Sequence, residues 1–364
     1  SRLLHSDPLR CRQENQLASA QAWRYERLMS QKKLHHGGDL KWAQKTFTYQ
    51  GDDWLDLSTG INPVAYPILP LAPETYTRLP DQSLQQQAVE AACQYYRAPS
   101  VETLALAPGS QALIQWLPRL RARSCVAILI PTYQEHARCW GLAGHDVHLV
   151  DNLEKARELQ PDVVIIVRPN NPTGSIVPAT DIITLANELA GRDGWVIVDE
   201  AFADTNTEND LASWTDISSL ILLKSFGKFF GLAGLRLGVT ISNETLAGHI
   251  RDAVGPWAVP GPTLSVAASA FRDAGWIAET SRRLEQDAAR LDRILSNADC
   301  TILGGTTLFR LVETERLQDL LMHLGNNGIL VRPFPYNAKW LRFGLPGSDQ
   351  DWERLTHCMV RFGS

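Results

Sequence analysis

The chain is organised around the stretch Leu223-Lys-Ser-Phe-Gly-Lys-Phe-Phe-Gly-Leu-Ala-Gly-Leu-Arg-Leu-Gly238. The apolar run from Ile217 to Leu223 is typical of a buried strand. It leads into a loop that presents Lys228 among aromatic residues and glycines, and a second strand starts near Arg236. A lysine amine in an apolar pocket has a lowered pKa and becomes nucleophilic. Ser225 and Arg236 supply a hydroxyl and a guanidinium suited to a phosphate. The stretch therefore predicts pyridoxal phosphate, with its aldehyde joined to Lys228 as a Schiff base.

Composition limits the class of protein. The 364 residues suit two domains. The formal net charge of -5 and the lack of a basic run argue against a nucleic-acid surface. No apolar segment reaches the length of a bilayer span, and no signal-peptide core is present. The six cysteines are scattered without a Cys-x-x-Cys pair, which favours reduced thiols in a cytoplasmic protein. No metal is expected, because His35 and His36 are adjacent instead of one helical turn apart.

Short apolar segments alternate with helical segments through the middle of the chain. They are Leu104 to Ala107, Val126 to Ile130, Val147 to Val150, Val163 to Val167 and Trp195 to Asp199. Strands that are apolar on both faces and separated by helices indicate an α/β fold with a mainly parallel sheet. The polar motifs follow the C-terminal ends of these strands, where open α/β sheets bind their ligands.

The sequence also predicts a division into four parts. We expect an N-terminal extension over 1–34, an arm over 35–75 that joins the small domain, a large domain over 76–262 and a small C-terminal α+β domain over 263–364. A long helical stretch from Leu264 to Asn297, kinked near Gly275, is expected to bridge the two domains.

Asp199 ends a buried strand, where a carboxylate is costly unless it is paired. A protonated pyridine nitrogen would be such a partner, worth about 1.5–3 kcal/mol, and would keep the ring an electron sink. Taken alone, Asp199 is better interpreted as a capping or loop aspartate.

Three further motifs have both a functional and an ordinary interpretation. Gly109, Ser110 and Gln111 open a helix where a phosphate could bind, or Ser110 is only an N-cap. Tyr133 could stack on a ring or simply pack. Asn171, in Asn-Pro-Thr-Gly, could donate to the pyridine 3-oxygen or form a plain turn. Their shared position at strand ends favours the functional set.

Together these motifs resemble the fold-type I pyridoxal-phosphate enzymes of the class I/II aminotransferase family, from about residue 35 to the C-terminus. The resemblance implies a seven-stranded sheet, a homodimer with sites at the interface, and no nucleic-acid or membrane partner. It implies that Lys228 holds the cofactor, that Asp199 binds the pyridine nitrogen, and that Arg342 binds the substrate carboxylate. The other implied cofactor contacts are Gly109, Ser110, Gln111, Tyr133, Asn171, Ser225 and Arg236.

Within this family the chain looks like the threonine-phosphate decarboxylases of cobalamin synthesis. The likeness rests on His36-Gly-Gly38, Ser58-x-x-Ile61-Asn62-Pro63 and Leu341-Arg-Phe-Gly-Leu-Pro-Gly347. It implies decarboxylation of L-threonine O-3-phosphate to (R)-1-amino-2-propanol O-2-phosphate. The residues expected around the substrate are His36, Gly37, Asn62, Asn171, Arg332 and Arg342.

Two positions depart from the family pattern. Phe202 stands where many aminotransferases have a tyrosine hydroxyl. Leu79 stands where relatives have a tyrosine that reaches the neighbouring subunit's cofactor, and Tyr76 is the nearest replacement. Two other functions stay open: an aminotransferase acting on histidinol phosphate or an aromatic amino acid, and a non-catalytic regulator with a similar ligand domain. Residues 1–34 are too short for the DNA-binding domain that such a regulator carries.

Overall fold

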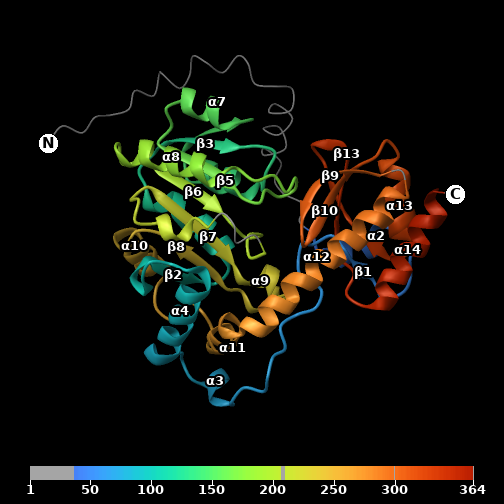
Figure 1. Cartoon of the computed structure of the whole chain (residues 1–364), viewed down its shortest axis with the longest axis horizontal. Helices are drawn as coiled ribbons and strands as arrows, with labels where there is room; N and C mark the ends of the chain where they lie inside the picture. Colours follow the sequence, from blue (N-terminus) through green and yellow to red (C-terminus); the bar gives the residue numbers. More distant parts are fainter. Residues whose placement is uncertain (1–36, 206–209, 299, 364) are drawn as a thin grey trace.

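The computed structural model describes residues 37–205, 210–298 and 300–363. The predicted N-terminal extension and His36 lie outside the described residues. Figure 1 shows a large sheet with helices packed around it and a smaller group of strands and helices beside it, with one long helix, α12, running between the two.

The large sheet has seven strands in the described part of the chain, in the order β2-β8-β7-β6-β5-β3-β4. Strand β8 is antiparallel to both of its neighbours, and the other pairs are parallel. The strands are β2 (Leu104–Ala107), β3 (Cys125–Leu129), β4 (Asp146–Val150), β5 (Val163–Val167), β6 (Trp195–Asp199), β7 (Leu220–Ser225) and β8 (Gly238–Ile241). This arrangement confirms the predicted mainly parallel α/β sheet.

Every residue of β5, β6 and β7 is buried, which indicates that helices cover both faces of this sheet. They are α4 (Gln82–Tyr96), α5 (Ser110–Trp116), α6 (Glu135–Leu142), α7 (Leu153–Glu158), α8 (Ala179–Ala190), α10 (Glu244–Val254) and α11 (Gly261–Arg272). The short helices are α3 (Glu74–Thr77), α9 (Phe226–Phe229) and the 3-10 turns Val101–Thr103, Leu117–Leu120, Ala212–Trp214 and Ala233–Leu235. Asp81 caps α4 by accepting from the backbone N–H of Leu84 at 2.8 Å.

The smaller group contains an antiparallel sheet in the order β12-β13-β10-β9 and a parallel pair, β1-β11. Its elements are α2 (Leu40–Thr46), β1 (Leu55–Asp56), β9 (Thr301–Thr306), β10 (Phe309–Glu313), α13 (Leu317–Asn326), β11 (Ile329–Leu330), β12 (Arg332–Phe334), β13 (Asn337–Gly344) and α14 (Asp349–Gly363). The pairing of β1 with β11 holds the N-terminal segment against the C-terminal part of the chain.

The predicted bridging helix is two helices. Helix α11 ends at Arg272 and α12 (Ala274–Ser296) begins after Asp273. The Asp273 carboxylate accepts from the backbone N–H of Trp276 at 3.0 Å and so caps α12. The prediction of one helix kinked near Gly275 was therefore wrong, because a capping aspartate starts a new helix just before the glycine.

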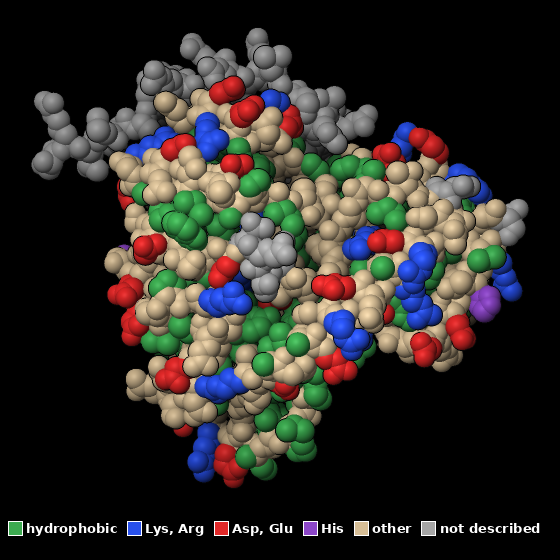
Figure 2. All heavy atoms as spheres, viewed as in Figure 1, with side chains coloured by type: hydrophobic (Ala, Val, Ile, Leu, Met, Phe, Trp, Pro, Cys, Tyr) green, Lys and Arg blue, Asp and Glu red, His purple; other side chains and the backbone are tan. Residues whose placement is uncertain are grey.

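Surface and composition add little to the functional assignment. On the face seen in Figure 2, acidic and basic side chains are interspersed without an extended area of one sign. Within the described residues no helix has both the length and the apolar character needed to cross a bilayer. The same residues contain no cluster of three or more side chains suited to a metal ion.

Candidate active site

A cavity of about 210 Å³ opens beyond the C-terminal ends of β5, β6 and β7. Parallel strands bring their carboxyl ends to one edge of a sheet, so motifs distant in sequence meet there. Eleven of the residues predicted from sequence line this one cavity: Gly37, Ser110, Gln111, Tyr133, Asn171, Asp199, Ser225, Lys228, Arg236, Arg332 and Arg342. Phe202 and the backbone of Thr59 and Gly60 complete much of the wall.

Lys228 lies in α9, the single helical turn that follows β7. Its amine lies 5.3 Å from the centre of the Phe202 ring. Burial and the nearby guanidinium groups of Arg342 and Arg332 lower the pKa of Lys228 to about 8, against an opposing effect of Asp199. The amine is therefore neutral more often near physiological pH than that of an ordinary lysine, and the neutral form is the one that attacks a carbonyl.

Asp199, the last residue of β6, is 4% exposed and shares the cavity with Lys228. One carboxylate oxygen is 2.9 Å from Nε2 of His136, and the other accepts from the backbone N–H of Ala201 at 3.0 Å. His136 was missed at the sequence level. The available signal was its position in the first turn of α6, the helix that follows Tyr133.

The expected phosphate cradle is built from three segments. Gly109 has φ +85°, and a Cβ there would come within 2.4 Å of the Arg236 guanidinium. A Cβ on Gly238 would come within 2.3 Å of the Ser110 backbone nitrogen, and Gly238 is the strand partner of Ser225. The two glycines thus allow the hydroxyls of Ser110 and Ser225 and the guanidinium of Arg236 to converge at the start of α5. The free backbone N–H groups at a helix start favour an anion.

The side chain of Gln111 has another task. Its amide nitrogen donates to Glu135 at 3.2 Å, and its carbonyl oxygen accepts from the Tyr133 hydroxyl at 3.2 Å. Gln111 therefore lines the cavity but uses its amide to hold Tyr133. For the expected phosphate contact, Gln111 would have to use its backbone N–H at the start of α5. The hydrogen bond between Gln111 and Glu135 could not be predicted from sequence, because Glu135 lies on a different helix.

Two arginines lie side by side at the opposite wall. Arg342 is buried, donates to the Asn171 side chain at 2.5 Å and donates to the Ser58 carbonyl at 2.8 Å. Arg332 is its direct partner in the antiparallel β12–β13 pair. Burial and the charge of Arg332 both lower the pKa of Arg342. Like charges placed opposite one another are unfavourable, so this wall is prepared for anionic groups of a ligand.

Asn62 was expected to contact substrate, but the structure uses its side chain elsewhere. Its amide donates to the Phe229 carbonyl at 2.8 Å, and its oxygen accepts from Arg283 at 2.7 Å. Its backbone N–H also donates to the carbonyl of Lys228 at 3.0 Å. Asn62 therefore holds the lysine turn in place, and we do not retain it among the substrate contacts. Lys224 lies outside this cavity and pairs with Glu200 at 2.5 Å.

Comparison with known proteins agrees with this geometry. The family model for aminotransferase class I and II matches residues 53–357. The chain belongs to that family. It is 40% identical over 330 residues to a threonine-phosphate decarboxylase from Pseudomonas aeruginosa, covering 90% of this chain and 98% of the relative. It is 39% identical over 329 residues to one from a Sinorhizobium species, covering 90% and 97%.

The solved structure of histidinol-phosphate aminotransferase from Sinorhizobium meliloti, in complex with pyridoxal-5'-phosphate, has the same fold as this chain. The TM-score is 0.75 at 18% identity, and the match covers 92% of this chain and 96% of that one. Family membership confirms pyridoxal phosphate as the cofactor predicted from sequence. The residues present fit this cofactor, because one cavity contains an amine with a lowered pKa, a buried carboxylate and a cradle for a phosphate.

Proposed function

We propose that this chain is a pyridoxal-phosphate enzyme that decarboxylates L-threonine O-3-phosphate to (R)-1-amino-2-propanol O-2-phosphate, in the cytoplasm, for cobalamin synthesis. The observation that carries the proposal is the pair Arg332 and Arg342, two guanidinium groups that line the same cavity as the nucleophilic amine of Lys228. A substrate with both a carboxylate and a phosphate would satisfy both charges. The two decarboxylases at about 40% identity support the same choice of substrate.

In this proposal each part of the cavity has one task. Ser110, Ser225 and Arg236 hold the cofactor phosphate, Asp199 holds the pyridine nitrogen in its protonated form, and Asn171 meets the 3-oxygen. When bound, pyridoxal phosphate supplies a sink for the electron pair left at Cα when a bond there breaks. The chain's own residues decide which bond breaks.

That choice depends on how the substrate is held. Arg342 anchors the carboxylate and Arg332 the phosphate, and two anchors on neighbouring strands fix the rotation about Cα. The carboxylate leaves as carbon dioxide, its bonding electrons stay at Cα, and the ammonium form of Lys228 returns a proton to that carbon. Arg342 cannot grip the carboxylate too tightly, because binding the ground state and the transition state equally gives no acceleration.

We also propose a homodimer. Large apolar side chains are exposed on the segment before α4 and on the loop before α11: Leu69 at 77%, Leu79 at 67%, Tyr76 at 65% and Trp257 at 59%. The first segment contacts the helix that follows the second, since α3 packs against α11. Exposed apolar patches of this kind mark protein interfaces. Tyr76 would then be available to the partner's cofactor phosphate, and light scattering should give twice the 40.5 kDa of one chain.

The function is tested by incubating purified holoenzyme with L-threonine O-3-phosphate and identifying the products by mass. We expect carbon dioxide and aminopropanol phosphate without added keto acid. Lys228→Ala should abolish turnover and the visible absorbance of the lysine-bound cofactor. Amine exchange that requires a keto acid would instead make the chain a histidinol-phosphate or related aminotransferase.

A further inference from the structure

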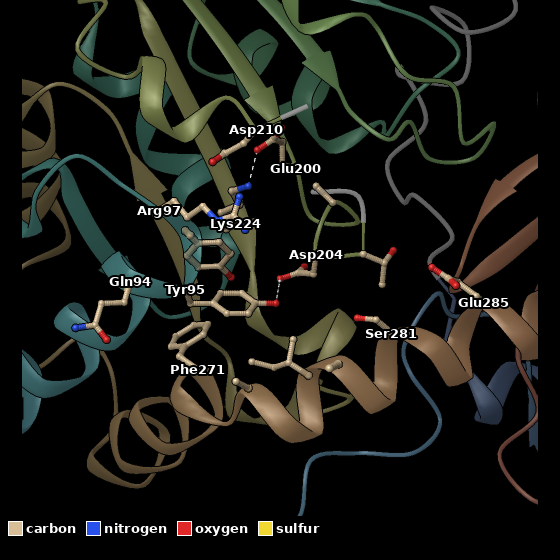
Figure 3. A pocket seen from close by; sticks show the side chains of 16 residues that line it. Gln94, Tyr95, Arg97, Glu200, Asp204, Asp210, Lys224, Phe271, Ser281 and Glu285 are labelled. Atoms are coloured by element: carbon tan, nitrogen blue, oxygen red, sulfur yellow. Dashed lines mark hydrogen bonds and ion pairs between the residues drawn. The ribbon is translucent and has the colours of Figure 1, made fainter. Parts of the chain in front are cut away.

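A second and larger cavity, of about 540 Å³, lies on the other side of β6 and β7 (Figure 3). Successive residues of a strand point to opposite faces of its sheet. Asp199 and Ser225 accordingly line the active site, whereas their chain neighbours Glu200 and Lys224 line the second cavity. Its volume is in the range of small-ligand sites.

The walls of this cavity come from four separate segments: the end of α4, the loop after β6, the end of β7, and α11 with α12 (Figure 3). Aromatic side chains, Tyr95, Tyr96 and Phe271, form the inner part. The charged side chains facing the cavity are Arg97, Glu200, Asp204, Asp210, Lys224 and Glu285. Carboxylates thus outnumber cations, which favours a cationic ligand and disfavours a phosphorylated one.

The cation closest to these aromatic walls is already engaged. The amine of Lys224 lies 2.5 Å from one oxygen of Glu200 and 5.2 Å from the centre of the Tyr96 ring. The other oxygen of Glu200 accepts from Arg168 at 2.9 Å. Glu200 is therefore shared by two cations, and the other carboxylates that face the cavity, Asp204, Asp210 and Glu285, still outnumber the remaining cation, Arg97.

Asp204 is the carboxylate best placed to receive a ligand. The side-chain contact that the structure gives it is the hydroxyl of Tyr95, which donates at 3.0 Å (Figure 3). Burial raises the pKa of Asp204 to about 6, with Lys224 opposing this effect. Tyr96 is 6% exposed, and its hydroxyl has no hydrogen-bond partner among the described residues. A buried polar atom without a partner is unusual and points to a missing ligand or water.

We propose that this second cavity binds a small organic ammonium ion. Its N–H donates to the Asp204 carboxylate, and its charge lies against the faces of Tyr95, Tyr96 and Phe271. A carboxylate combined with aromatic faces is the arrangement that recognises ammonium groups in water. The ligand would lie on the other side of β6 and β7 from the reacting groups, in the cavity lined by Glu200 and Lys224, the chain neighbours of Asp199 and Ser225. The proposal does not depend on the decarboxylase assignment.

The probe for the test is N,N-dimethylethanolamine, a tertiary amine that is protonated at neutral pH. It cannot condense with the cofactor aldehyde, so binding at Lys228 does not confuse the result. Isothermal titration of holoenzyme should show saturable binding of this amine and none of isoamyl alcohol, its uncharged isostere. Asp204→Asn keeps an acceptor for Tyr95 and should weaken binding about tenfold or more, since it removes the charge.

Two further arms keep the result interpretable. Asp216→Asn, which changes an exposed carboxylate outside both cavities, should leave the titration unchanged. Binding by the unmodified holoenzyme should weaken as the pH falls through about 6, because Asp204 then takes up a proton. Equal binding of the amine and the neutral isostere, no binding of the amine, or unchanged affinity in Asp204→Asn would each overturn the proposal.

Discussion

Arg332 and Arg342 are direct partners in the antiparallel β12–β13 pair, and both line the cavity that contains Lys228. Like charges placed opposite one another repel, and an anionic ligand would relieve this repulsion. Under the proposed function, two adjacent strands carry the groups that select the substrate.

The first prediction concerns this pair. Arg332→Gln should raise the KM for L-threonine O-3-phosphate about ten- to hundredfold, because one charge-assisted contact to the substrate is lost. Cofactor affinity should change little. Steady-state kinetics and a cofactor titration check the two halves. Lys339→Gln removes a cation from the exposed side of the same hairpin, where it pairs with Glu315, and should leave KM unchanged. An unaltered KM in Arg332→Gln would show that Arg332 does not contact the substrate.

A second prediction uses the pKa of Lys228, about 8 and below its usual value. The amine is charged below that pH and neutral above it, so the rate at which apoenzyme takes up pyridoxal phosphate should rise with pH through about 8. Arg332→Gln should move the midpoint to higher pH, because it removes a cation that lowers this pKa. Stopped-flow absorbance measures both curves. A midpoint near the ordinary lysine value would contradict the burial of this amine.

A third prediction addresses His136, whose ring nitrogen lies 2.9 Å from the Asp199 carboxylate. His136→Ala leaves that buried carboxylate with one partner fewer, and kcat should fall about ten- to hundredfold at saturating cofactor. His249→Ala changes an exposed histidine on α10 and serves as the matched control. Equal kcat in the two variants would mean that the contact to Asp199 has no part in turnover.

The fourth prediction tests the phosphate cradle. Gly109→Ala puts a Cβ 2.4 Å from the Arg236 guanidinium at a residue with φ +85°, so Arg236 must move. Affinity for pyridoxal phosphate should fall, whereas affinity for pyridoxal, which lacks the phosphate, should fall much less. Gly234→Ala is the control, because a Cβ at Gly234 would meet nothing within 4 Å. Equal losses for both forms of the cofactor would place the damage outside the cradle.

Much of this site could be predicted because strand ends and turns are encoded locally. The apolar runs before Asp199 and before Ser225 predicted β6 and β7, and parallel pairing then brought both residues to one cavity. Lys228 was expected in a loop, and the structure instead places it in α9, a single helical turn directly after β7. Motifs of this kind depend on neighbours in sequence, so the sequence carries them.

Contacts between distant segments could not be predicted in the same way. Asn62 has the residue type of a ligand contact, but its hydrogen-bond partners are Phe229 and Arg283, far away in the chain. His136 reaches Asp199 across the packing of α6 on the sheet. A short polar side chain can serve substrate or backbone, and only the tertiary structure decides between them.

The most direct measurement is to locate the cofactor on the protein. Holoenzyme is reduced with borohydride, digested and mapped by mass spectrometry. The account predicts that the phosphopyridoxyl mass is found on the peptide at Lys228 and is absent from Lys224, which lies four residues earlier and faces the other cavity. Modification at Lys224, or none at Lys228, would contradict the account.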